Sequence, residues 1–289
     1  MKEISGHTIP FAVLGHPIGH TLSPIMHNRS IQALGMDAIY LAFDVAPENL
    51  MRVLKAMRDM GFGGVNLTVP LKEVAFKGVD AHASSATLAR SVNTIEFLAD
   101  GRLKGHSTDG DGFVAAVRES FHRSIAGLSV FVLGCGGAGR AVAITCATEG
   151  AARIVLSDIE QARIDAVASE IAQLAPAVVV ASAGMSADAW AAASLEADLV
   201  IQATPIGMKV DDKPLLGAGA FRPGQFLFDL IYMFPNTGIM TEAGKAGATT
   251  ANGLGMLLHQ GARSFEIWTG RQPAIEAMRA ALEQAVYSV

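Results

Sequence analysis

The residues that point most directly to a chemistry are the glycines of segment 134–143, Gly-Cys-Gly-Gly-Ala-Gly-Arg-Ala-Val-Ala. The apolar run 129–133 before them is typical of a buried strand, and the Ala-rich stretch 138–149 is typical of a helix. A glycine turn between a strand and a helix leaves backbone N–H groups and the positive helix end open to an anion. We therefore expect a diphosphate-binding loop formed by Gly134, Gly136, Gly137, Ala138 and Gly139.

An acidic residue follows this loop at the spacing that a dinucleotide requires. A second apolar run, 153–157, ends at Asp158, which lies 24 residues after Gly134. A carboxylate there can accept hydrogen bonds from adenine ribose hydroxyls, and it repels a 2′-phosphate. Strand, glycine turn, helix, strand and acid in this order predict a dinucleotide site. The alternative is a tight turn that only packs a helix on a sheet.

Polar side chains also gather at the predicted ends of strands, where α/β proteins usually bind ligands. They occupy the segments 15–28, 66–73, 91–94 and 105–110. The first offers two hydroxyls, Thr21 and Ser23, and the others add amides, further hydroxyls, Lys72 and Asp109. One lysine and one aspartate among hydroxyls and amides suit a neutral or singly charged polyhydroxylated ligand better than a phosphate.

Each of these clusters has a structural alternative that the sequence leaves open. Thr21 and Ser23 could cap a helix, and Asn66 and Asn93 could be turn residues. Lys72 and Glu73 could form an exposed charged pair, and Asp109-Gly110 could be a turn dipeptide. Three histidines, His16, His20 and His27, lie close in sequence, but no spacing typical of metal ligands accompanies them, so we expect no metal.

The elements that must position these residues alternate between strand and helix patterns. Strands are predicted at 10–14, 39–45, 64–68, 92–98, 102–106, 129–133, 153–157, 177–181, 198–203 and 225–231, and helices at 112–121, 138–149, 256–269 and 273–287. Leu50, Val53, Leu54 and Met57 fall on one face of a further helix. Asp100-Gly101 is a hairpin signal, which predicts one antiparallel strand in an otherwise parallel sheet.

The resulting expectation is a two-domain α/β protein. Residues 1–109 would form a substrate-binding domain with a mixed sheet, completed by C-terminal helices within 252–289. Residues 110–251 would form a Rossmann domain with a doubly wound parallel sheet.

Composition narrows the class of protein further. The 289 residues are 51% hydrophobic and 17% charged, with a net charge of −5, so nothing favours binding to nucleic acid or to an anionic membrane. Two cysteines fit a reducing compartment, and neither a signal peptide nor a membrane-spanning stretch is evident. We expect a soluble, cytoplasmic protein. Whether it forms a homodimer stays open.

Eight motifs, taken together, resemble the shikimate/quinate dehydrogenase family over essentially the whole chain. The motifs are 15–28, 66–73, 89–94, 105–112, 134–143, Ala-Thr-Pro-Ile-Gly-Met at 203–208, Asp-Leu-Ile-Tyr at 229–232 and 252–260. The family's architecture, a substrate domain plus a Rossmann domain, agrees with the expected layout.

The resemblance implies a role for individual residues. Lys72 matches the family's catalytic lysine and Asp109 its paired carboxylate. A lysine poised in this way can take the proton of a secondary alcohol as hydride leaves for nicotinamide. The resemblance also implies substrate contacts at Thr21, Ser23, Asn66, Thr68, Asn93, Tyr232 and Gln260, and contacts with the nicotinamide half of the cofactor at Thr204, Leu230 and Gly253.

Departures from the family pattern sharpen the expected activity. NADP-using relatives carry Asn-Arg-Thr after the second Rossmann strand, whereas this chain reads Ser157-Asp158-Ile159, so we expect NAD as the cofactor. Thr21, Leu71, Ser107 and Pro235 also depart from the common residues or their positions. They favour a catabolic or specialised enzyme over one of aromatic amino acid biosynthesis.

The expected reaction is NAD-dependent oxidation at the C3 hydroxyl of shikimate, quinate or both, giving 3-dehydroshikimate or 3-dehydroquinate. A dehydrogenase for an amino analogue of shikimate is one alternative. A catalytically silent regulator that binds NAD and a metabolite is another, although a pure binder has no need of the pair formed by Lys72 and Asp109.

Overall fold

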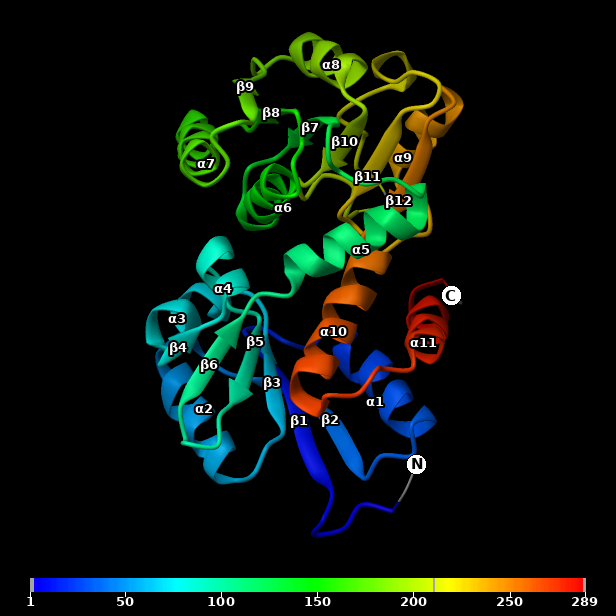
Figure 1. The fold of residues 1–289 in the computed structure, drawn as a ribbon. Coiled ribbons are helices and arrows are strands. Elements are labelled where there is room, and N and C mark those ends of the chain that lie inside the picture. Colours follow the sequence, from blue (N-terminus) through cyan, green and yellow to red (C-terminus); the bar gives the residue numbers. More distant parts are fainter. Residues whose placement is uncertain (1–2, 210, 288–289) are drawn as a thin grey trace. The chain divides into compact units, whose positions relative to one another are not determined.

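The chain divides into two compact units in a computed structural model that describes residues 3–209 and 211–287. Unit 1 comprises Met1–Gly112 and Leu257–Val289, and unit 2 comprises Phe113–Met256. The sequence placed its boundaries nearby, at 109/110 and 251/252. Two continuous helices, α5 (Asp109–Phe121) and α10 (Leu254–Thr269), carry the chain from one unit into the other (Figure 1).

Unit 1 contains a six-stranded mixed sheet in the order β2-β1-β3-β5-β6-β4. Its strands are β1 (Ile9–Gly15), β2 (Ala38–Asp44), β3 (Gly64–Leu67), β4 (Ala81–His82), β5 (Thr94–Phe97) and β6 (Leu103–His106). Strand β1 runs parallel to β2 and β3, and β6 runs parallel to β4. Strand β5 is antiparallel to both β3 and β6, which confirms the hairpin predicted at Asp100-Gly101.

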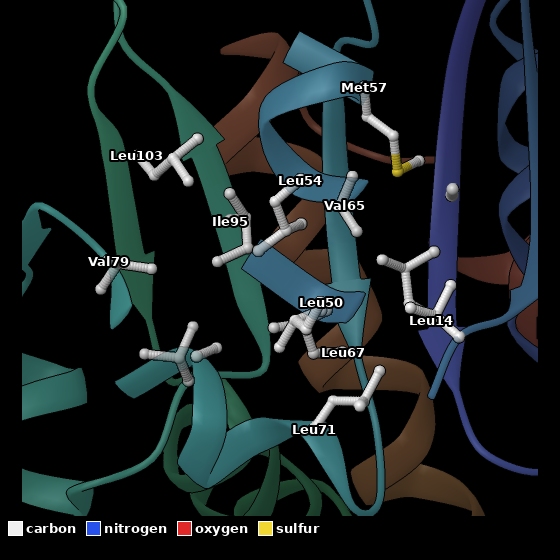
Figure 2. Close-up of a cluster of buried hydrophobic side chains, with 14 of the residues drawn as sticks. Leu14, Leu50, Leu54, Met57, Val65, Leu67, Leu71, Val79, Ile95 and Leu103 are labelled. Atoms are coloured by element: carbon white, nitrogen blue, oxygen red, sulfur yellow. The ribbon is translucent and has the colours of Figure 1, made fainter. Parts of the chain in front are cut away.

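Alternating side chains of this sheet pack on two different sets of helices. Ala12 and Leu14 of β1 face one buried cluster with α2, α3 and α4, and side chains of α2 and the strands meet in it (Figure 2). Phe11 and Val13 face the opposite cluster, which includes side chains from α1 and α10. Helix α11 packs against α1. The helices are α1 (Ser23–Ala33), α2 (Leu50–Asp59), α3 (Leu71–Gly78), α4 (Ser84–Ala89), α11 (Ile275–Tyr287) and the short 3₁₀ turn η1 (Pro47–Asn49).

Unit 2 contains a six-stranded parallel sheet in the order β12-β11-β10-β7-β8-β9. The strands are β7 (Ser129–Leu133), β8 (Arg153–Ser157), β9 (Val179–Ser182), β10 (Leu199–Gln202), β11 (Phe226–Asp229) and β12 (Thr249–Asn252). This is the Rossmann order, and its switch point lies between β7 and β10, where such sheets bind ligands. The predicted α/β fold class is confirmed.

Helices cover both faces of the unit 2 sheet. Leu227 of β11 lies in a buried cluster with α8 (Ala187–Glu196), η2 (Ala218–Ala220) and α9 (Gly238–Lys245). The rings of Phe226 and Phe228, which alternate with Leu227, contact Phe121 of α5 instead. Helices α6 (Gly137–Thr148) and α7 (Gln161–Leu174) follow β7 and β8. The sequence prediction missed β12 and α9, because both are short and β12, Thr-Thr-Ala-Asn, has little apolar character.

In the part of the chain that the structure describes, no helix has the length and apolar character needed to cross a membrane.

Candidate active site

Lys72 and Asp109 form an ion pair in unit 1. Lys72 lies in the first turn of α3, which follows β3, and Asp109 is the first residue of α5. The Lys72 ammonium donates to Oδ2 of Asp109 at 2.6 Å, and the two side chains are 28% and 18% exposed. Lys72 is therefore not one half of an exposed pair with Glu73. Its side chain is partly exposed, and the ion pair holds its nitrogen in one direction.

Asn93 holds the other oxygen of this aspartate. Its Nδ2 donates to Oδ1 of Asp109 at 2.9 Å and lies 3.4 Å from Oε1 of Gln260 on α10. Its Oδ1 accepts from the backbone N–H of Thr108 and from the hydroxyl of Thr94, both at 2.9 Å. With 2% exposure, Asn93 is a buried junction between β5, α5 and α10, and its side chain is not that of a surface turn.

Asn66 forms a second buried junction on the neighbouring strand β3. Its Nδ2 lies 3.0 Å from the Asn93 carbonyl oxygen, 3.1 Å from Oγ1 of Thr94 and 2.9 Å from Oγ of Ser264. Its Oδ1 accepts from the phenol of Tyr40 at 2.7 Å. We refer to the connected residues as the Asn66–Asn93 network: Tyr40, Asn66, Asn93, Thr94, Thr108, Asp109, Gln260 and Ser264.

Sequence reasoning assigned no role to Tyr40, Thr108 or Ser264. Each is buried; Tyr40 lies on β2 and Ser264 on α10, beside apolar core residues such as Phe265, and Thr108 lies in the short connection between β6 and α5. Buried polar groups are almost always hydrogen-bonded, so a polar residue at a core position is the signal that could have revealed them.

Thr21 and Ser23 lie together where the loop after β1 enters α1. Their hydroxyl oxygens are 3.3 Å apart, and the Ser23 backbone N–H donates to Oγ1 of Thr21 at 3.3 Å. Leu22 is the N-cap of α1, and no side chain caps the helix, so neither hydroxyl serves as the cap that was the structural alternative. Thr68 directly follows β3, and its backbone N–H donates to the Leu14 carbonyl oxygen at 2.9 Å.

The glycine loop, residues 134–139, joins β7 to α6 in unit 2. Gly134 has a φ of +100°, and a Cβ there would lie 2.9 Å from the Ala203 carbonyl carbon. A Cβ on Gly139 would lie 1.8 Å from the Gly134 carbonyl oxygen, so helix and turn pack too closely for any side chain. A Cβ on Gly136 or Gly137 would meet nothing within 4 Å.

The open positions fit a diphosphate. Gly136 is the N-cap of α6 and supplies no capping side chain, which leaves the first-turn N–H groups to an anion. Gly136 and Gly137 add no Cβ over this helix end, and Ala138 adds only an exposed methyl.

Asp158, at the end of β8, binds the glycine loop directly. Its Oδ2 accepts from the Cys135 backbone N–H at 2.7 Å, and its Oδ1 accepts from the Glu160 N–H at 2.9 Å. The carboxylate is 6% exposed, and Arg163 lies 3.9 Å away while pairing with Glu160 at 2.6 Å. The acid expected to meet a ribose thus also fixes the shape of the loop. Burial and Asp158 raise the pKa of the Cys135 thiol to about 11, which disfavours its thiolate form at neutral pH.

Thr204 lies in the loop after β10, where Gln202 holds it in place. The buried Gln202 amide donates to Oγ1 of Thr204 at 2.9 Å and to the Ile206 carbonyl at 2.7 Å, and its oxygen accepts from the Thr204 N–H. The sequence prediction did not single out Gln202. A polar residue closing the apolar strand Leu-Val-Ile-Gln is the signal that it overlooked.

Leu230 and Gly253 follow the neighbouring strands β11 and β12. A Cβ on Gly253 would lie 2.2 Å from the Leu230 carbonyl oxygen, so the two backbones are in contact. Asp229 organises this region: it accepts from the Thr237 hydroxyl at 2.6 Å and from the Ile231 N–H at 3.0 Å. Burial raises the pKa of Asp229 to about 6. The half-buried Tyr232 belongs to this unit, unlike the other predicted substrate residues.

The three clustered histidines differ in their surroundings. His16 pairs with Asp44, whereas His27 is fully buried with no hydrogen-bond partner on either ring nitrogen, and burial lowers its pKa to about 3. Within residues 3–209 and 211–287, no three His, Cys, Asp or Glu side chains are grouped as metal ligands would be.

Comparison with known proteins finds two family models that match parts of this chain. Residues 13–95 match the shikimate dehydrogenase substrate binding domain, and residues 253–283 match the shikimate 5′-dehydrogenase C-terminal domain. A shikimate dehydrogenase (NADP(+)) of Methanopyrus kandleri is 39% identical, over 97% of each chain. That enzyme is named for NADP(+), whereas the sequence of this chain predicts NAD.

Two solved structures are also similar. A shikimate 5-dehydrogenase from Listeria monocytogenes, in complex with shikimate and NAD, superposes with a TM-score of 0.90 at 32% identity, over 98% of this chain and 99% of that one. A quinate dehydrogenase from Corynebacterium glutamicum, in complex with NAD, gives 0.86 at 28% identity, over 95% and 98%. The chain belongs to the shikimate dehydrogenase family and is thus an NAD(P)-dependent oxidoreductase.

Proposed function

We propose that the chain transfers hydride between NAD and the C3 hydroxyl of shikimate, quinate or both. The observation that carries this proposal is the ion pair between Lys72 and Asp109, held by Asn93, in a chain of this family. Unit 1 would act as the substrate domain and unit 2 as the dinucleotide domain. A regulator without turnover would gain nothing from such a pair.

Lys72 is the proposed acid–base group. In oxidation, its neutral amine accepts the proton of the C3 hydroxyl at Nζ, and in reduction the ammonium returns it. Asp109 directs the nitrogen, and Asn93 holds Asp109 through its second oxygen, so the lysine meets the alcohol in one orientation. The nicotinamide, when bound, supplies the hydride acceptor or donor.

The remaining unit 1 residues would bind the ring. Thr21 and Ser23 place two hydroxyls side by side, which suits two hydrogen bonds to a carboxylate. Thr68 and Gln260 are half-buried and can reach ring hydroxyls, whereas Asn66 and Asn93 are almost fully buried and would offer only an edge of each amide. Tyr232 of unit 2 completes the proposed substrate set.

The glycine loop would bind the diphosphate through the open positions at Gly136, Gly137 and Ala138. Gly134 and Gly139 are required by close packing, and Thr204, Leu230 and Gly253 would flank the nicotinamide half, the latter two through backbone atoms.

The cofactor is proposed to be NAD, although relatives such as the Methanopyrus enzyme are named for NADP(+). Asp158 and Glu160 place two carboxylates at the end of β8, and Arg163 is already paired with Glu160. A 2′-phosphate would face this negative charge, a penalty on the order of a few kcal/mol after screening.

Initial rates with NAD and NADP, each with shikimate and with quinate at alkaline pH, test the proposal. Turnover of shikimate or quinate with NAD supports the proposal, and the ratio of their kcat/KM values identifies the preferred substrate. If neither substrate is turned over although NAD binds, an amino analogue of shikimate is the next substrate to assay. Preference for NADP would contradict the cofactor assignment alone.

A further inference from the structure

Thr94 places a fully buried hydroxyl between the two asparagines of the Asn66–Asn93 network. It is the first residue of β5, and its exposed fraction is 0%. Its Oγ1 lies 2.9 Å from Oδ1 of Asn93, 3.1 Å from Nδ2 of Asn66 and 2.7 Å from Oγ of Ser264. Ser264 of α10 is also 0% exposed, and its Oγ lies 2.9 Å from Nδ2 of Asn66. The two hydroxyls therefore join β3, β5 and α10 at a point that solvent does not reach.

The Asn93 amide can take only one orientation in these surroundings. Its NH₂ group must face Oδ1 of Asp109, 2.9 Å away, because an ionised carboxylate only accepts hydrogen bonds. Its amide oxygen then faces the backbone N–H of Thr108 and the hydroxyl of Thr94, both at 2.9 Å. The single hydroxyl proton of Thr94 must lie on this contact, since otherwise two oxygens with no proton between them would meet at that distance.

The direction of the neighbouring hydrogen bonds follows from that proton. Because Thr94 donates to Asn93, it is an acceptor at its other contacts, and the Ser264 hydroxyl donates to it at 2.7 Å. Ser264 in turn accepts from Nδ2 of Asn66 at 2.9 Å. The donors thus run in one direction, from Asn66 through Ser264 and Thr94 to the Asn93 amide oxygen.

We propose that Thr94 is a positioning residue for the acid–base pair. Its hydroxyl holds the Asn93 amide in the orientation that donates to Asp109, and Asp109 directs the Lys72 nitrogen. Ser264 supports Thr94 by donating to its oxygen from α10. The inference rests on the proposed function, in which Lys72 exchanges the proton of the C3 hydroxyl. Thr94 acts only through Asn93, because its own side chain has no exposed surface with which to touch a ligand.

Without the Thr94 hydroxyl, the Asn93 amide oxygen loses one of its two donors. The Thr108 hydroxyl lies 3.3 Å from the same oxygen, but its proton goes to the Gln260 carbonyl oxygen at 2.9 Å, so it is a poor replacement. Since Asn93 is only 2% exposed, water is a poor replacement as well. The amide can then turn away from Asp109, and the acid–base pair loses its fixed geometry.

The test compares two substitutions of Thr94. Thr94→Val keeps the shape of the side chain and removes the hydroxyl, whereas Thr94→Ser keeps the hydroxyl and removes the methyl group. We expect Thr94→Val to lower kcat about tenfold, the scale of one buried hydrogen bond, with KM for NAD within about twofold of wild type. Thr94→Ser should retain most of the kcat that Thr94→Val loses. Equal losses of kcat in the two variants, or no loss in Thr94→Val, would overturn the proposal.

A double variant shows whether Thr94 acts through the lysine. In the Lys72→Ala background, Thr94→Val should change the residual kcat less than about twofold, because the group that Thr94 positions is gone. A tenfold loss in that background as well would overturn the proposal, since Thr94 would then act independently of Lys72.

Ser30→Ala is the matched control for the loss of a buried hydroxyl. Ser30 is 0% exposed in the same unit, and its Oγ accepts from the Ala274 backbone N–H at 3.0 Å. Its substitution should lower Tm and leave kcat unchanged. A fall of kcat in Ser30→Ala as large as in Thr94→Val would overturn the proposal, because lost stability alone would then explain both.

Ser264→Ala covers the case in which Thr94→Val folds poorly. We expect it to lower kcat about threefold, less than Thr94→Val, because Asn66 can still donate to Thr94 at 3.1 Å. An unchanged kcat in Ser264→Ala would then overturn the proposal. A wild-type enzyme inactive on both shikimate and quinate would instead reject the proposed function, and the role of Thr94 with it.

Discussion

The two units hold their functional groups in different ways. In unit 1, the Asn66–Asn93 network joins side chains from β2, β3, β5, α5 and α10, and hydrogen bonds decide where Lys72 and Asp109 point. In unit 2, the glycine loop relies mainly on backbone atoms: close approaches without Cβ atoms decide its shape, and the Asp158 carboxylate is the one side chain described above that binds it. The side-chain site of unit 1 depends on many residues distant in sequence, whereas most of the backbone site lies in one short segment.

The largest expected effect comes from removing Lys72, the side chain on which the proposed chemistry of unit 1 depends. Lys72→Ala should lower kcat about 10²–10⁴-fold, the usual size of an acid–base contribution, because nothing replaces the amine at the alcohol. Lys77→Ala is the control, since Lys77 is an exposed lysine of the same helix. Steady-state rates of both variants test the acid–base role of Lys72. Near-normal turnover by Lys72→Ala would show that Lys72 does not have this role.

Two alanine substitutions separate packing from ligand space in the glycine loop. Gly139→Ala places a Cβ 1.8 Å from the Gly134 carbonyl oxygen and should destabilise the fold by about 3 kcal/mol, at the upper end for overpacking. Gly137→Ala meets nothing within 4 Å, so Tm should stay the same while KM for NAD rises about tenfold. Thermal melts and NAD titrations check both. Equal melting temperatures for the two variants would contradict a loop shaped by close packing.

The difference between the side-chain site of unit 1 and the backbone site of unit 2 also explains which features the sequence could predict. Strands β7 and β8, the glycine loop and Asp158 follow from local patterns, because a strand, a turn and a helix N-terminus are adjacent in the chain. Lys72 and Asp109 stand out in the sequence as charged residues among polar clusters at strand ends, but their pairing in catalysis came from the family resemblance, and the sequence could not show that they touch. The partnership of Tyr40 with Asn66 and of Ser264 with Thr94 joins residues 26 and 170 positions apart, and no local pattern reports it.

Asp229 is the exception in unit 2, a buried side chain that shapes the backbone around Leu230. Burial raises its pKa from 3.8 to about 6, so the folded state binds the proton more tightly than the unfolded chain. The stabilisation from the neutral Asp229 carboxyl is complete below pH 3.8 and is lost as the pH rises through about 6. Above pH 6 the carboxyl is charged, and the free energy of unfolding is lower by about 3 kcal/mol than with the neutral carboxyl.

Asp229→Asn should therefore become more stable relative to wild type as the pH rises from 4 to 7, by about 2–3 kcal/mol, in urea denaturation. The amide keeps one acceptor for the Ile231 N–H and can donate to Thr237. Asp165→Asn, at an exposed position of α7, should show no such trend. A constant difference between Asp229→Asn and wild type at all pH values would mean that this carboxyl does not titrate in that range.

The smallest expected effect concerns cofactor choice, a property of unit 2 that we expect a side chain outside the glycine loop to set. Asp158 is a poor position for a substitution, because an arginine there would leave the N–H groups of Cys135 and Glu160 without their acceptor. Ile159 is 77% exposed and follows Asp158 directly. Ile159→Arg should shift the ratio of kcat/KM for NADP over NAD upward about tenfold at low salt, with Tm unchanged, because a guanidinium can pair with a 2′-phosphate. Ile159→Gln, of similar length but uncharged, should leave the ratio near that of wild type.

The shift caused by Ile159→Arg should shrink as salt is added, since it arises between exposed charges. A shift of equal size in Ile159→Gln would mean that side-chain shape, and not charge, selects the cofactor at the end of β8.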